Sequence, residues 1–440
     1  MRADIFFNSK NFAVIGASRD EKKVGNSIFR NLISNKSLKV FPVNPSADEI
    51  EGYRCFRSIL EIPYNIDCAV IAVKSEIVKQ IMEECAKKRV KSAVIISAGF
   101  SESGNKNLEL EIKEIADKNK IVLLGPNVLG FVSSYKGINA SFFNGMPKKG
   151  NVSILSQSGA LGVGILDMLI KEEVGLSGFV SLGNSAQMDV SDFIDYFAYD
   201  SNTKTIILYL ESLKEARGKK FIEACSRCRK KIYAIKSGKT SAGMKAAQSH
   251  TAALASEKGV YEGVFKQCRI TEISNLTELF NICKISNNPK FRKIGKKACI
   301  ITNAGGLGVL SSDYLSQNNI EIPELPAKVK DELNKILPEG WSRNNPIDLV
   351  GDALAERYEN TINVLEKEKF FDFFIVLLTP QHMTQPLETA KVIFRADKPA
   401  FACFFGGNKI KQAVEYLNYN GIPVFSEPKE LADVLGKITG

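Results

Sequence analysis

The sequence has few histidines and no long apolar segment. Only 2 of its 440 residues are histidine and only 1 is tryptophan. The longest apolar runs, such as IVLLG and FFIVLLTP, are far shorter than the ~20 residues that a membrane-spanning helix needs. Charged residues interrupt the first stretch, MRADIFFNSKNFAVIG, so we expect no signal peptide. These absences favour a cytoplasmic protein without a membrane segment.

The nine cysteines do not form a disulfide framework. Their number is odd and they are scattered through apolar strands, which suits a reducing compartment. Cys225 and Cys228 form a single CxxC pair, and the sequence offers no second pair to complete a zinc site. We therefore interpret the pair as two thiols of one helix, and we expect no metal site.

The net charge of +10 does not identify a nucleic-acid-binding protein. Lysine and arginine recur at helical spacing along the whole chain, and RNP-like, zinc-finger and helix-turn-helix patterns are missing. A P-loop of the form GxxxxGK[ST] is missing as well. A lysine-rich solvated surface explains the charge and suits anionic ligands, so we expect no nucleic-acid partner.

Short apolar strands alternate with longer helical segments, which is typical of parallel α/β sheets. A chain of 440 residues exceeds a single core, and the loop-like stretches NGMPKKG and NNPKFRKI divide it. We predict three domains, at residues 1–145, 146–288 and 289–440. The predicted strands are Phe12–Ile15, Lys39–Val43, Asp67–Val73, Ser92–Ser97, Ile121–Leu124, Asn151–Leu155, Gly178–Ser181, Thr205–Leu210, Lys231–Ile235, Lys297–Ile301, Asp372–Leu378, Pro399–Phe405 and Ile422–Phe425.

A sequence repeat links the second and third domains. GNVSILSQSGALGVGILD begins at residue 150 and KKACIITNAGGLGVLSSD begins at residue 296, an offset of 296 − 150 = 146. The offset pairs Ser156 with Thr302 and Gly162 with Gly308. Both stretches indicate a buried strand, a tight turn of small residues and a helix. We therefore predict that the two domains are structural relatives.

The first predicted strand leads into a turn of the kind that binds phosphate groups. The turn residues are Gly16, Ala17 and Ser18. The next glycine, Gly25, comes too late for the GxGxxG pattern of a dinucleotide site. Asn44 and Pro45 follow the second strand, where an NAD site would have an acidic residue. We therefore predict a Rossmann-like core that binds another phosphate-bearing ligand.

Three further loops lie at carboxyl ends of strands in the first domain, which is the edge where open parallel sheets bind ligands. The residues that we expect to contact the ligand there are Val73, Ser97, Ala98, Gly99 and Asn127. Ordinary tight turns would explain any one of these loops. Together with the loops after the first and second strands there are five loops along this edge, and ordinary tight turns explain all five less readily.

Two helix starts made of small residues predict anion sites. A helix N-terminus carries roughly half a positive charge and several unpaired N–H groups. Small residues there let an anion approach the backbone, although they also let a helix pack closely on a strand. Two such loops in related domains favour one anion held between both helix ends. The residues are Ser158, Gly159, Ala160, Gly305 and Gly306.

His250 is the predicted nucleophile. It lies in AAQSHTAALA, within the long loop that follows the strand KIYAIKSG, and Glu211 ends the strand TIILYLE of the same sheet. The carboxylate, the loop and the helix start at Ser158 should therefore meet at one edge. A carboxylate that holds one ring N–H directs the lone pair of the other nitrogen outward, toward phosphorus. An incidental loop histidine is the simpler alternative, and it is our interpretation of His382.

Taken together and in this order, the motifs resemble the α subunit of the ADP-forming (NDP-forming) acyl-CoA synthetases, relatives of succinyl-CoA synthetase. VIGAS, VNP, SAGF and GPNVLG resemble the CoA-binding domain of that family. SQSGALG, YLES and KSGKTSAGMKAAQSHTAALA resemble its succinyl-CoA-synthetase-like domain, and TNAGGLGVL with NNPIDLVGDA resembles the third. The resemblance covers essentially the whole chain. It implies a Rossmann-like CoA-binding domain followed by two flavodoxin-like parallel α/β domains.

The resemblance also implies a reaction and its site. The family converts acyl-CoA, phosphate and ADP reversibly to carboxylic acid, CoA and ATP, through acyl phosphate and phosphohistidine. His250 corresponds to the phosphorylated histidine and Glu211 to the carboxylate that orients or stabilises it. Ala252 is a departure, because the family usually has glycine at this position.

A partner is implied as well. The family binds ADP or ATP with Mg²⁺ on an ATP-grasp domain that this sequence does not contain, so we expect a separate ATP-grasp β subunit and a heterotetramer. Three alternatives stay open. They are a CoA-binding regulatory protein with an inactive histidine site, a protein-acylating relative, and a dehydrogenase. The second is disfavoured because no acyltransferase domain is present, and the third by Asn44 and Pro45.

Overall fold

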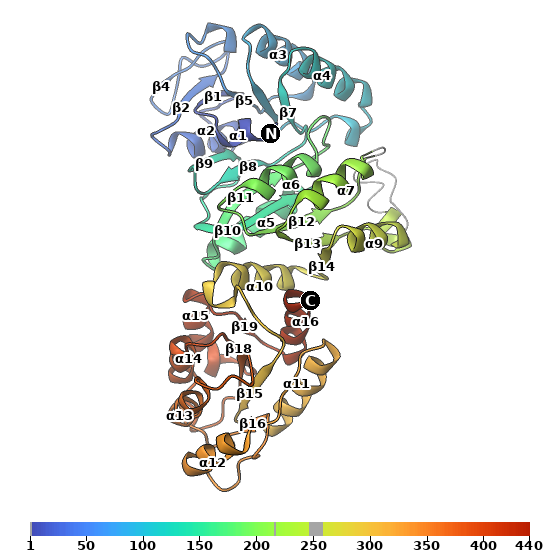
Figure 1. The fold of residues 1–440 in the computed structure, drawn as a ribbon. Helices are drawn as coiled ribbons and strands as arrows, with labels where there is room; N and C mark the ends of the chain where they lie inside the picture. Colours follow the sequence, from blue (N-terminus) through green and yellow to red (C-terminus); the bar gives the residue numbers. More distant parts are fainter. Residues whose placement is uncertain (1, 215–216, 246–257) are drawn as a thin grey trace. The chain divides into compact units, whose positions relative to one another are not determined.

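The computed structural model describes residues 2–214, 217–245 and 258–440, which form mostly parallel sheets covered by helices (Figure 1). The predicted α/β fold class is confirmed. The chain divides into two compact units. The first runs to Lys171 and continues from Gly175 to Ser274, and the second combines Glu172–Val174 with Asn275–Gly440. None of the described helices is long and apolar enough to cross a bilayer.

The first sheet has five parallel strands in the order β2-β1-β5-β6-β7. Its strands are β1 (Asn11–Ile15), β2 (Lys39–Val43), β5 (Cys68–Ile71), β6 (Ser92–Ile95) and β7 (Val122–Leu124). The surrounding elements are α1 (Asp4–Phe7), α2 (Val24–Ile33), α3 (Ser75–Lys87), α4 (Lys106–Lys118) and the short pair β3 (Glu49–Ile50) and β4 (Tyr53–Arg54). β5 and β6 are buried along their whole length, as continuous apolar strands of a parallel sheet should be.

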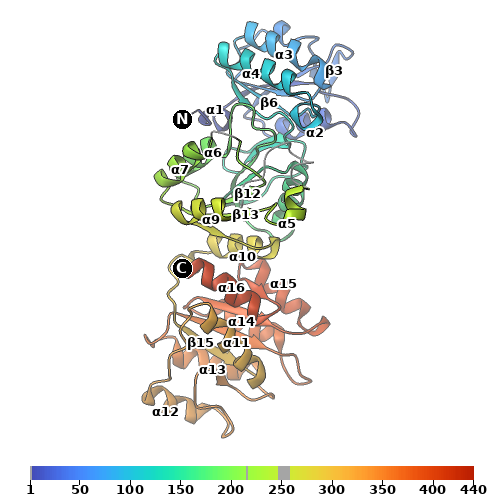
Figure 2. The ribbon, with the colours of Figure 1, turned by 90° about the vertical axis from the view of Figure 1, so that its right-hand side faces the viewer.

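The second sheet has the order β14-β13-β12-β10-β11-β8-β9. Its parallel strands are β10 (Lys149–Ser156), β11 (Leu176–Ser181), β12 (Thr205–Leu210), β13 (Lys231–Lys236) and β14 (Ile270–Glu272). An antiparallel hairpin, β8 (Gly130–Ser133) and β9 (Ile138–Ser141), extends it beside β11. Its helices are α5 (Gly159–Lys171), α6 (Val190–Tyr199), α7 (Gly218–Arg227) and α9 (Lys258–Gln267). Figure 2 shows α5 on one side of this sheet and α6 and α7 on the other.

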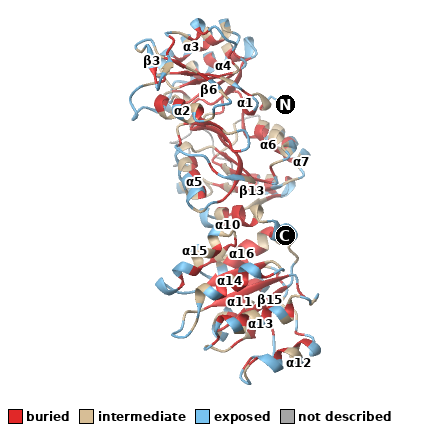
Figure 3. Ribbon diagram, turned by 90° about the vertical axis from the view of Figure 1, so that its left-hand side faces the viewer, coloured by how far each residue is buried: buried red, intermediate tan, exposed pale blue. Residues whose placement is uncertain are grey.

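The third sheet lies in the second unit and has five parallel strands in the order β16-β15-β17-β18-β19. They are β15 (Ala298–Thr302), β16 (Ile347–Asp348), β17 (Phe373–Leu378), β18 (Ala400–Phe404) and β19 (Val424–Phe425). The helices are α10 (Leu276–Asn287), α11 (Gly305–Gln317), α12 (Ala327–Ile336), α13 (Ala355–Leu365), α14 (Pro386–Arg395), α15 (Lys411–Tyr419) and α16 (Pro428–Thr439). Figure 3 shows buried strands covered by partly exposed helices.

The three sheets share one strand order. Counting each sheet's own parallel strands along the chain, the order is 2-1-3-4-5 in all three. In the second and third sheets, strand 1 is β10 and β15, and these strands begin the two copies of the sequence repeat. The predicted structural relation between the repeat copies is therefore confirmed. In this topology ligands bind where strands 1 and 3 lie side by side, beyond their carboxyl ends.

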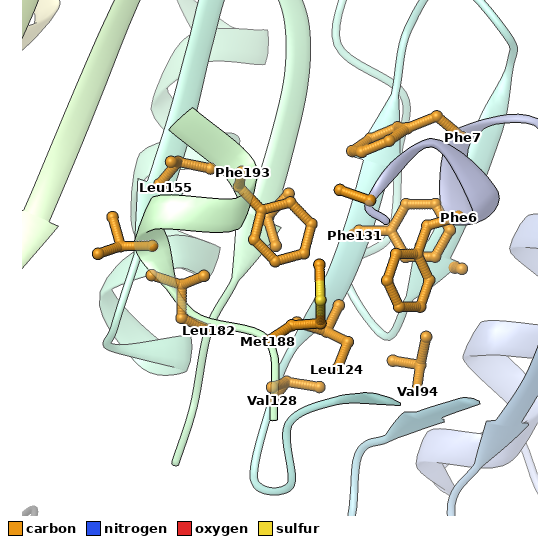
Figure 4. Close-up of a cluster of buried hydrophobic side chains, with 14 of the residues drawn as sticks. Phe6, Phe7, Val94, Leu124, Val128, Phe131, Leu155, Leu182, Met188 and Phe193 are labelled. Carbon is orange, nitrogen blue, oxygen red and sulfur yellow. The ribbon is translucent and has the colours of Figure 1, made fainter. Parts of the chain in front are cut away.

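Aromatic side chains join the first two sheets into one unit. Phe6 and Phe7 of α1 lie 5.7 and 5.5 Å from Phe131 of β8, measured between ring centroids. Figure 4 shows them in one cluster with Leu124 of β7 and Leu155 of β10, which come from different sheets. All five side chains are at least 99% buried. The pocket described below is thus built on a continuous hydrophobic core.

The predicted domain boundaries at residues 145 and 288 stay predictions. β8 and β9 precede residue 145, yet β8 pairs with β11 in the second sheet. α10 precedes residue 288, yet it belongs to the second unit, where it contacts α16. The hairpin of β8 and β9 thus belongs with the second sheet, and α10 belongs with the helices of the second unit.

Candidate functional site

The first unit contains a pocket of about 780 Å³ at the carboxyl ends of strands from its two sheets. Loops after β5, β6 and β7 form one part of it, and the start of α5 forms another. Apolar side chains such as Leu129, Phe142 and Val163 complete its wall. The predicted site residues that line it are Val73, Ser97, Ala98, Asn127, Ser158, Gly159 and Ala160. The loops predicted to hold a phosphate-bearing ligand and the helix start predicted to hold an anion therefore open into one cavity.

The turn after β1 lies beside this pocket and requires glycine. Gly16 has a φ of +90°, and a Cβ added to it would lie 2.3 Å from the carbonyl oxygen of Ala72, a pocket residue. A Cβ added to Gly25 would lie 1.9 Å from the carbonyl oxygen of Gly16. Ala17 and Ser18 continue the same turn. Gly25 comes too late in the sequence for a GxGxxG motif. Because it has no side chain, it still lets helix α2 touch the turn after β1.

Asn44 supports that turn from the end of β2. Its side-chain Nδ2 donates to the carbonyl oxygen of Ala17 at 2.7 Å, and its Oδ1 accepts from the backbone N–H of Ser46 at 2.9 Å. Pro45 lies inside this small loop. Neither residue is among those that line the pocket. Their predicted contact with a ligand stays a prediction.

The SAGF loop is held by an internal carboxylate. Gly99 has a φ of +104°, which favours glycine, and a Cβ there would lie 2.6 Å from Ser75 Oγ. The backbone N–H groups of Gly99 and Phe100 donate to Glu102 Oε1 at 2.6 and 3.1 Å. The other oxygen of Glu102 accepts from Asn184 Nδ2. These bonds fix the loop that presents Ser97 and Ala98 to the pocket.

Asn127 and Asn184 connect the two sheets of the first unit. Asn127 follows a cis Gly125–Pro126 bond and has a φ of +61°. Its Nδ2 lies 3.3 Å from Asn184 Oδ1, and Asn184 Nδ2 donates to Glu109 Oε2 at 2.9 Å. Lys214 lies on the loop after β12 and forms a 3.0 Å ion pair with Glu109. Burial raises the pKa of Glu109, but the Ser101 hydroxyl and Lys214 together hold this pKa below its usual value.

The start of α5 is open, as an anion site requires. Ser156 Oγ donates to the carbonyl oxygen of Ser158 at 2.7 Å, and Ser158 Oγ accepts from the N–H of Leu161 at 3.3 Å. The nearest atom to a Cβ added at Gly159 would be 3.6 Å away. At Gly162 it would be Phe179 Cζ at 2.5 Å. Close packing therefore explains Gly162, whereas it does not explain Gly159.

Glu211 lies directly after β12 and is buried, with 7% of its surface exposed. Its backbone N–H donates to Gln157 Oε1 at 2.5 Å, and the N–H of Ser212 donates to the same oxygen at 3.0 Å. Gln157 Nε2 donates in turn to the carbonyl oxygen of Ser212 at 2.6 Å. On the other side, Lys236 Nζ donates to the carbonyl oxygen of Glu211 at 2.8 Å. Burial lowers the pKa of Lys236, which is 6% exposed.

The second copy of the repeat forms similar contacts, although Asn303 binds one residue where Gln157 binds two. Thr302 Oγ1 donates to the carbonyl oxygen of Ala304 at 3.0 Å, as Ser156 does to Ser158. Asn303, at the offset position of Gln157, accepts from the N–H of Thr379 and donates to its carbonyl oxygen, both at 2.9 Å. Thr379 therefore occupies the place that Glu211 has in the first unit. Sequence reasoning missed Gln157 and Lys236, although the amide side chain repeated at 157 and 303 was a visible signal.

The helix start at Gly305 has a carboxylate beside it. A Cβ added to Gly305 would lie 2.7 Å from Asp348 Oδ2, whereas nothing lies within 4 Å of one added to Gly306. Asp348 Oδ1 accepts from the N–H of Val350 at 2.9 Å. α5 and α11 belong to different compact units. The anion site at Gly305 and Gly306 stays a prediction.

The predicted nucleophile, His250, lies outside the described residues, and so does Ala252. His382 is described and exposed. All nine cysteines are free thiols, and burial raises the pKa of Cys225 and of Cys228. Within residues 2–214, 217–245 and 258–440, no group of three or more His, Cys, Asp or Glu side chains is arranged to hold a metal ion.

Comparison with known proteins agrees with this architecture. Three family models match in sequence order: a CoA binding domain at residues 10–134, a succinyl-CoA ligase like flavodoxin domain at 149–286 and a Ligase-CoA domain at 298–437. The chain therefore has the domains of a CoA-binding ligase of the succinyl-CoA ligase type. Relatives define the class further, because the chain is 39% identical to the α subunit of ADP-forming acetate–CoA ligase II of Pyrococcus furiosus, over 98% of this chain and 95% of that one.

A second relative and a solved structure support the same assignment. The chain is 43% identical to an ADP-forming acetate–CoA ligase of Methanocaldococcus jannaschii, over 96% of this chain and 60% of the relative. It superposes with a TM-score of 0.94 and 35% identity on acetyl-coenzyme A synthetase 1 of Ca. Korarchaeum cryptofilum in complex with phosphate and ADP, over 100% of this chain and 96% of that one. The chain belongs to the family of ADP-forming acetate–CoA ligases, and the predicted resemblance is confirmed.

Proposed function

We propose that the chain is the α subunit of an ADP-forming acyl-CoA synthetase. It converts acyl-CoA, phosphate and ADP reversibly to carboxylic acid, CoA and ATP. The pocket carries this proposal, because it joins the loops of the CoA-binding domain to the open start of α5. A long substrate with a phosphate-bearing end and a reactive thioester end fits such an arrangement.

In the first step, phosphate and the acyl-CoA thioester meet at the start of α5. Residues Val73, Ser97, Ala98 and Asn127 contact CoA, and the N–H groups at Ser158 to Ala160 hold phosphate. An oxygen of hydrogen phosphate attacks the thioester carbonyl carbon, the carbon–sulfur bond breaks, and CoA leaves as the thiol with the proton that hydrogen phosphate gives up. The N–H groups stabilise the negative charge that develops in the transition state.

In the second step, the neutral ring of His250 attacks phosphorus. The bond between phosphorus and the acyl oxygen breaks, the carboxylate leaves, and the ring holds the phosphoryl group. The carboxylate of Glu211 accepts the N–H of the other ring nitrogen and offsets the positive charge that forms on the ring. The buried position of Glu211 at the end of β12, next to the pocket residue Gln157, supports this role.

The third step involves a partner. Phosphohistidine passes its phosphoryl group to ADP with Mg²⁺ on an ATP-grasp β subunit, and the complex is a heterotetramer. The proposal is supported by relatives of matching length that are named α subunits, and by single-chain relatives of which this chain spans about 60%. Nine free cysteines suit the reducing cytoplasm, which we propose as the compartment.

Incubation of the purified chain with acetyl-CoA and radiolabelled phosphate tests the first two steps. The expected result is a label on the protein that is acid-labile and base-stable, as phosphohistidine is. The variant His250→Asn should take up no label. If neither acetyl-CoA nor longer and aromatic acyl-CoAs give label, and CoA still binds, the chain is a CoA-binding regulatory protein and the proposal is wrong.

A further inference from the structure

Two side chains hold the peptide groups of Glu211 from opposite sides. The parallel pairing of β12 ends at Ser156↔Tyr209 on one side and at Leu210↔Lys236 on the other. Glu211 and Ser212 thus lie just beyond the paired region, where strand ends are ordinarily free to move. Gln157 binds both of their N–H groups on the β10 side. Lys236 binds the carbonyl oxygen of Glu211 on the β13 side.

We propose that Gln157 is a positioning residue for the reaction, acting through Glu211. It ties the residue after β12 to the loop that begins α5, so the Glu211 carboxylate keeps a fixed position relative to the anion held there. The inference rests on the proposed function, because it gives Gln157 a role only if Glu211 takes part in phosphoryl transfer. A displacement of about 1 Å at such a group can lower a rate by ~100-fold.

The second unit shows that an amide at this place does not require an acidic partner. Asn303, beside α11, accepts from the N–H of Thr379 and donates to its carbonyl oxygen, whereas Gln157 accepts from Glu211 and Ser212 and donates to Ser212. An amide that binds the residues after a strand, which we call the brace, therefore occurs in both related sheets. In the first unit the brace holds the peptide groups of a residue with a buried side chain, Glu211, and there we assign it a role in the reaction.

The test compares two glutamines that make the same kind of contact in the same unit. Gln187 accepts from the N–H of Leu123 at 2.8 Å and donates to the carbonyl oxygen of Ile121 at 3.2 Å, and it is 8% exposed. It is not among the residues that line the pocket. The variants Gln157→Met and Gln187→Met each remove an amide that binds backbone groups, and Gln187→Met also removes a 2.6 Å bond to Asp117 Oδ1. Both should therefore lower the unfolding temperature.

Only Gln157→Met should slow phosphoryl transfer. We expect its rate of labelling from acetyl-CoA and phosphate to fall by roughly 10- to 100-fold, with CoA affinity within about twofold of the wild type. Gln187→Met should label at close to the wild-type rate. Equal losses in both variants would assign Gln157 a merely structural role and overturn the inference.

A double-mutant cycle separates action through Glu211 from direct contact with the substrate. Adding Gln157→Met to Glu211→Gln should cost little further rate, because the group that Gln157 positions is already inactive. Losses that multiply, together with a raised KM for phosphate, would show that Gln157 contacts substrate independently and would overturn the inference. If the wild-type chain takes up no label at all, the proposed function fails, and this result is distinct from either outcome.

Discussion

Single glycines shape the pocket by letting backbone segments touch. At Gly16 and Gly25 an added Cβ would enter the carbonyl group of a neighbouring segment, so the turn after β1 and the start of α2 tolerate no side chain. Val24 and Ala72, next to these glycines, line the pocket. The shape of the pocket beside Val24 and Ala72 therefore depends on Gly16 and Gly25, although neither glycine lines the pocket.

Gly25→Ala should destabilise the protein. The methyl group would lie 1.9 Å from a backbone oxygen that cannot rotate away, and we expect a loss of at least ~2 kcal/mol. Gly164→Ala is the matched control, because Gly164 is an exposed position inside α5 with no atom within 4 Å of the new Cβ. That variant should gain up to ~1 kcal/mol from helix propensity. Urea unfolding of both measures the difference, and equal stability of the two variants would refute the assigned contact.

Sequence analysis identified pocket residues that lie directly after a predicted strand, because that signal is contained in a few neighbouring residues. Small residues directly after a buried strand predict a turn at the ligand edge, and Val73, Ser97 and Ser158 do line the pocket. Gln157 and Lys236 were missed because their partners lie 54 and 25 residues away in sequence. Their role depends on which strands are neighbours, which local patterns do not state.

At the level of elements, strand prediction succeeded where a strand is a continuous apolar run. The runs in β5, β6 and β17 are buried on both faces, so their sequences contain no competing signal. β8 and β9 were missed because they form a short antiparallel hairpin at a sheet edge. β16 was missed because only Ile347 and Asp348 are paired. β3, β4 and β14 were missed as well: β3 and β4 pair only with each other, and β14 is a short strand at the edge of the second sheet.

The ion pair between α4 and the loop after β12 gives stability a pH dependence. Lys214→Met removes the ammonium beside Glu109, which is buried. Lys214 is itself 38% exposed, so water screens part of the interaction and we expect a loss of roughly 1 kcal/mol at pH 7. The folded-state pKa of Glu109 lies below the usual 4.5, so its stabilising effect is complete above pH 4.5 and is lost as pH falls through the folded-state value.

The difference between wild type and Lys214→Met should therefore narrow as the pH is lowered from 7 to below 4.5. Urea unfolding at several pH values measures it. Lys118→Met is the control, since Lys118 is exposed at the other end of α4 and its replacement removes the same charge two turns of helix or more from Glu109. A gap that stays constant with pH, or that matches the control, would contradict the assigned role of the ion pair.

At the scale of the whole molecule, the three sheets have the same order of parallel strands, but the residues at their strand ends differ. The first two sheets share a core and form a pocket, and the third repeats the parallel strand order of the second, with an amide side chain again bound to the backbone after strand 3. The repeat differs at one chemically decisive place, because Thr379 stands where the second sheet has Glu211. Of the two residues whose peptide groups are bound in this way, Glu211 has the acidic side chain, and it lies next to the pocket residue Gln157.

The proposed division of the reaction between subunits makes a further prediction. Relatives named α subunits match this chain over nearly their full length, whereas single-chain relatives extend well beyond the part that it spans. The purified chain should thus reach the phosphohistidine stage with acyl-CoA and phosphate, and then stop. Added ADP and Mg²⁺ alone should leave the label on the protein, because no group in the proposed mechanism of this chain holds the nucleotide.

Adding a purified ATP-grasp β subunit from a related ligase should discharge the label as ATP. The label on the protein and the ATP formed are measured in the same samples, so loss of one must equal gain of the other. A heat-denatured sample of the same β subunit is the control. If the chain alone converts its label to ATP, the nucleotide site lies on this chain, and the proposed need for a partner is wrong.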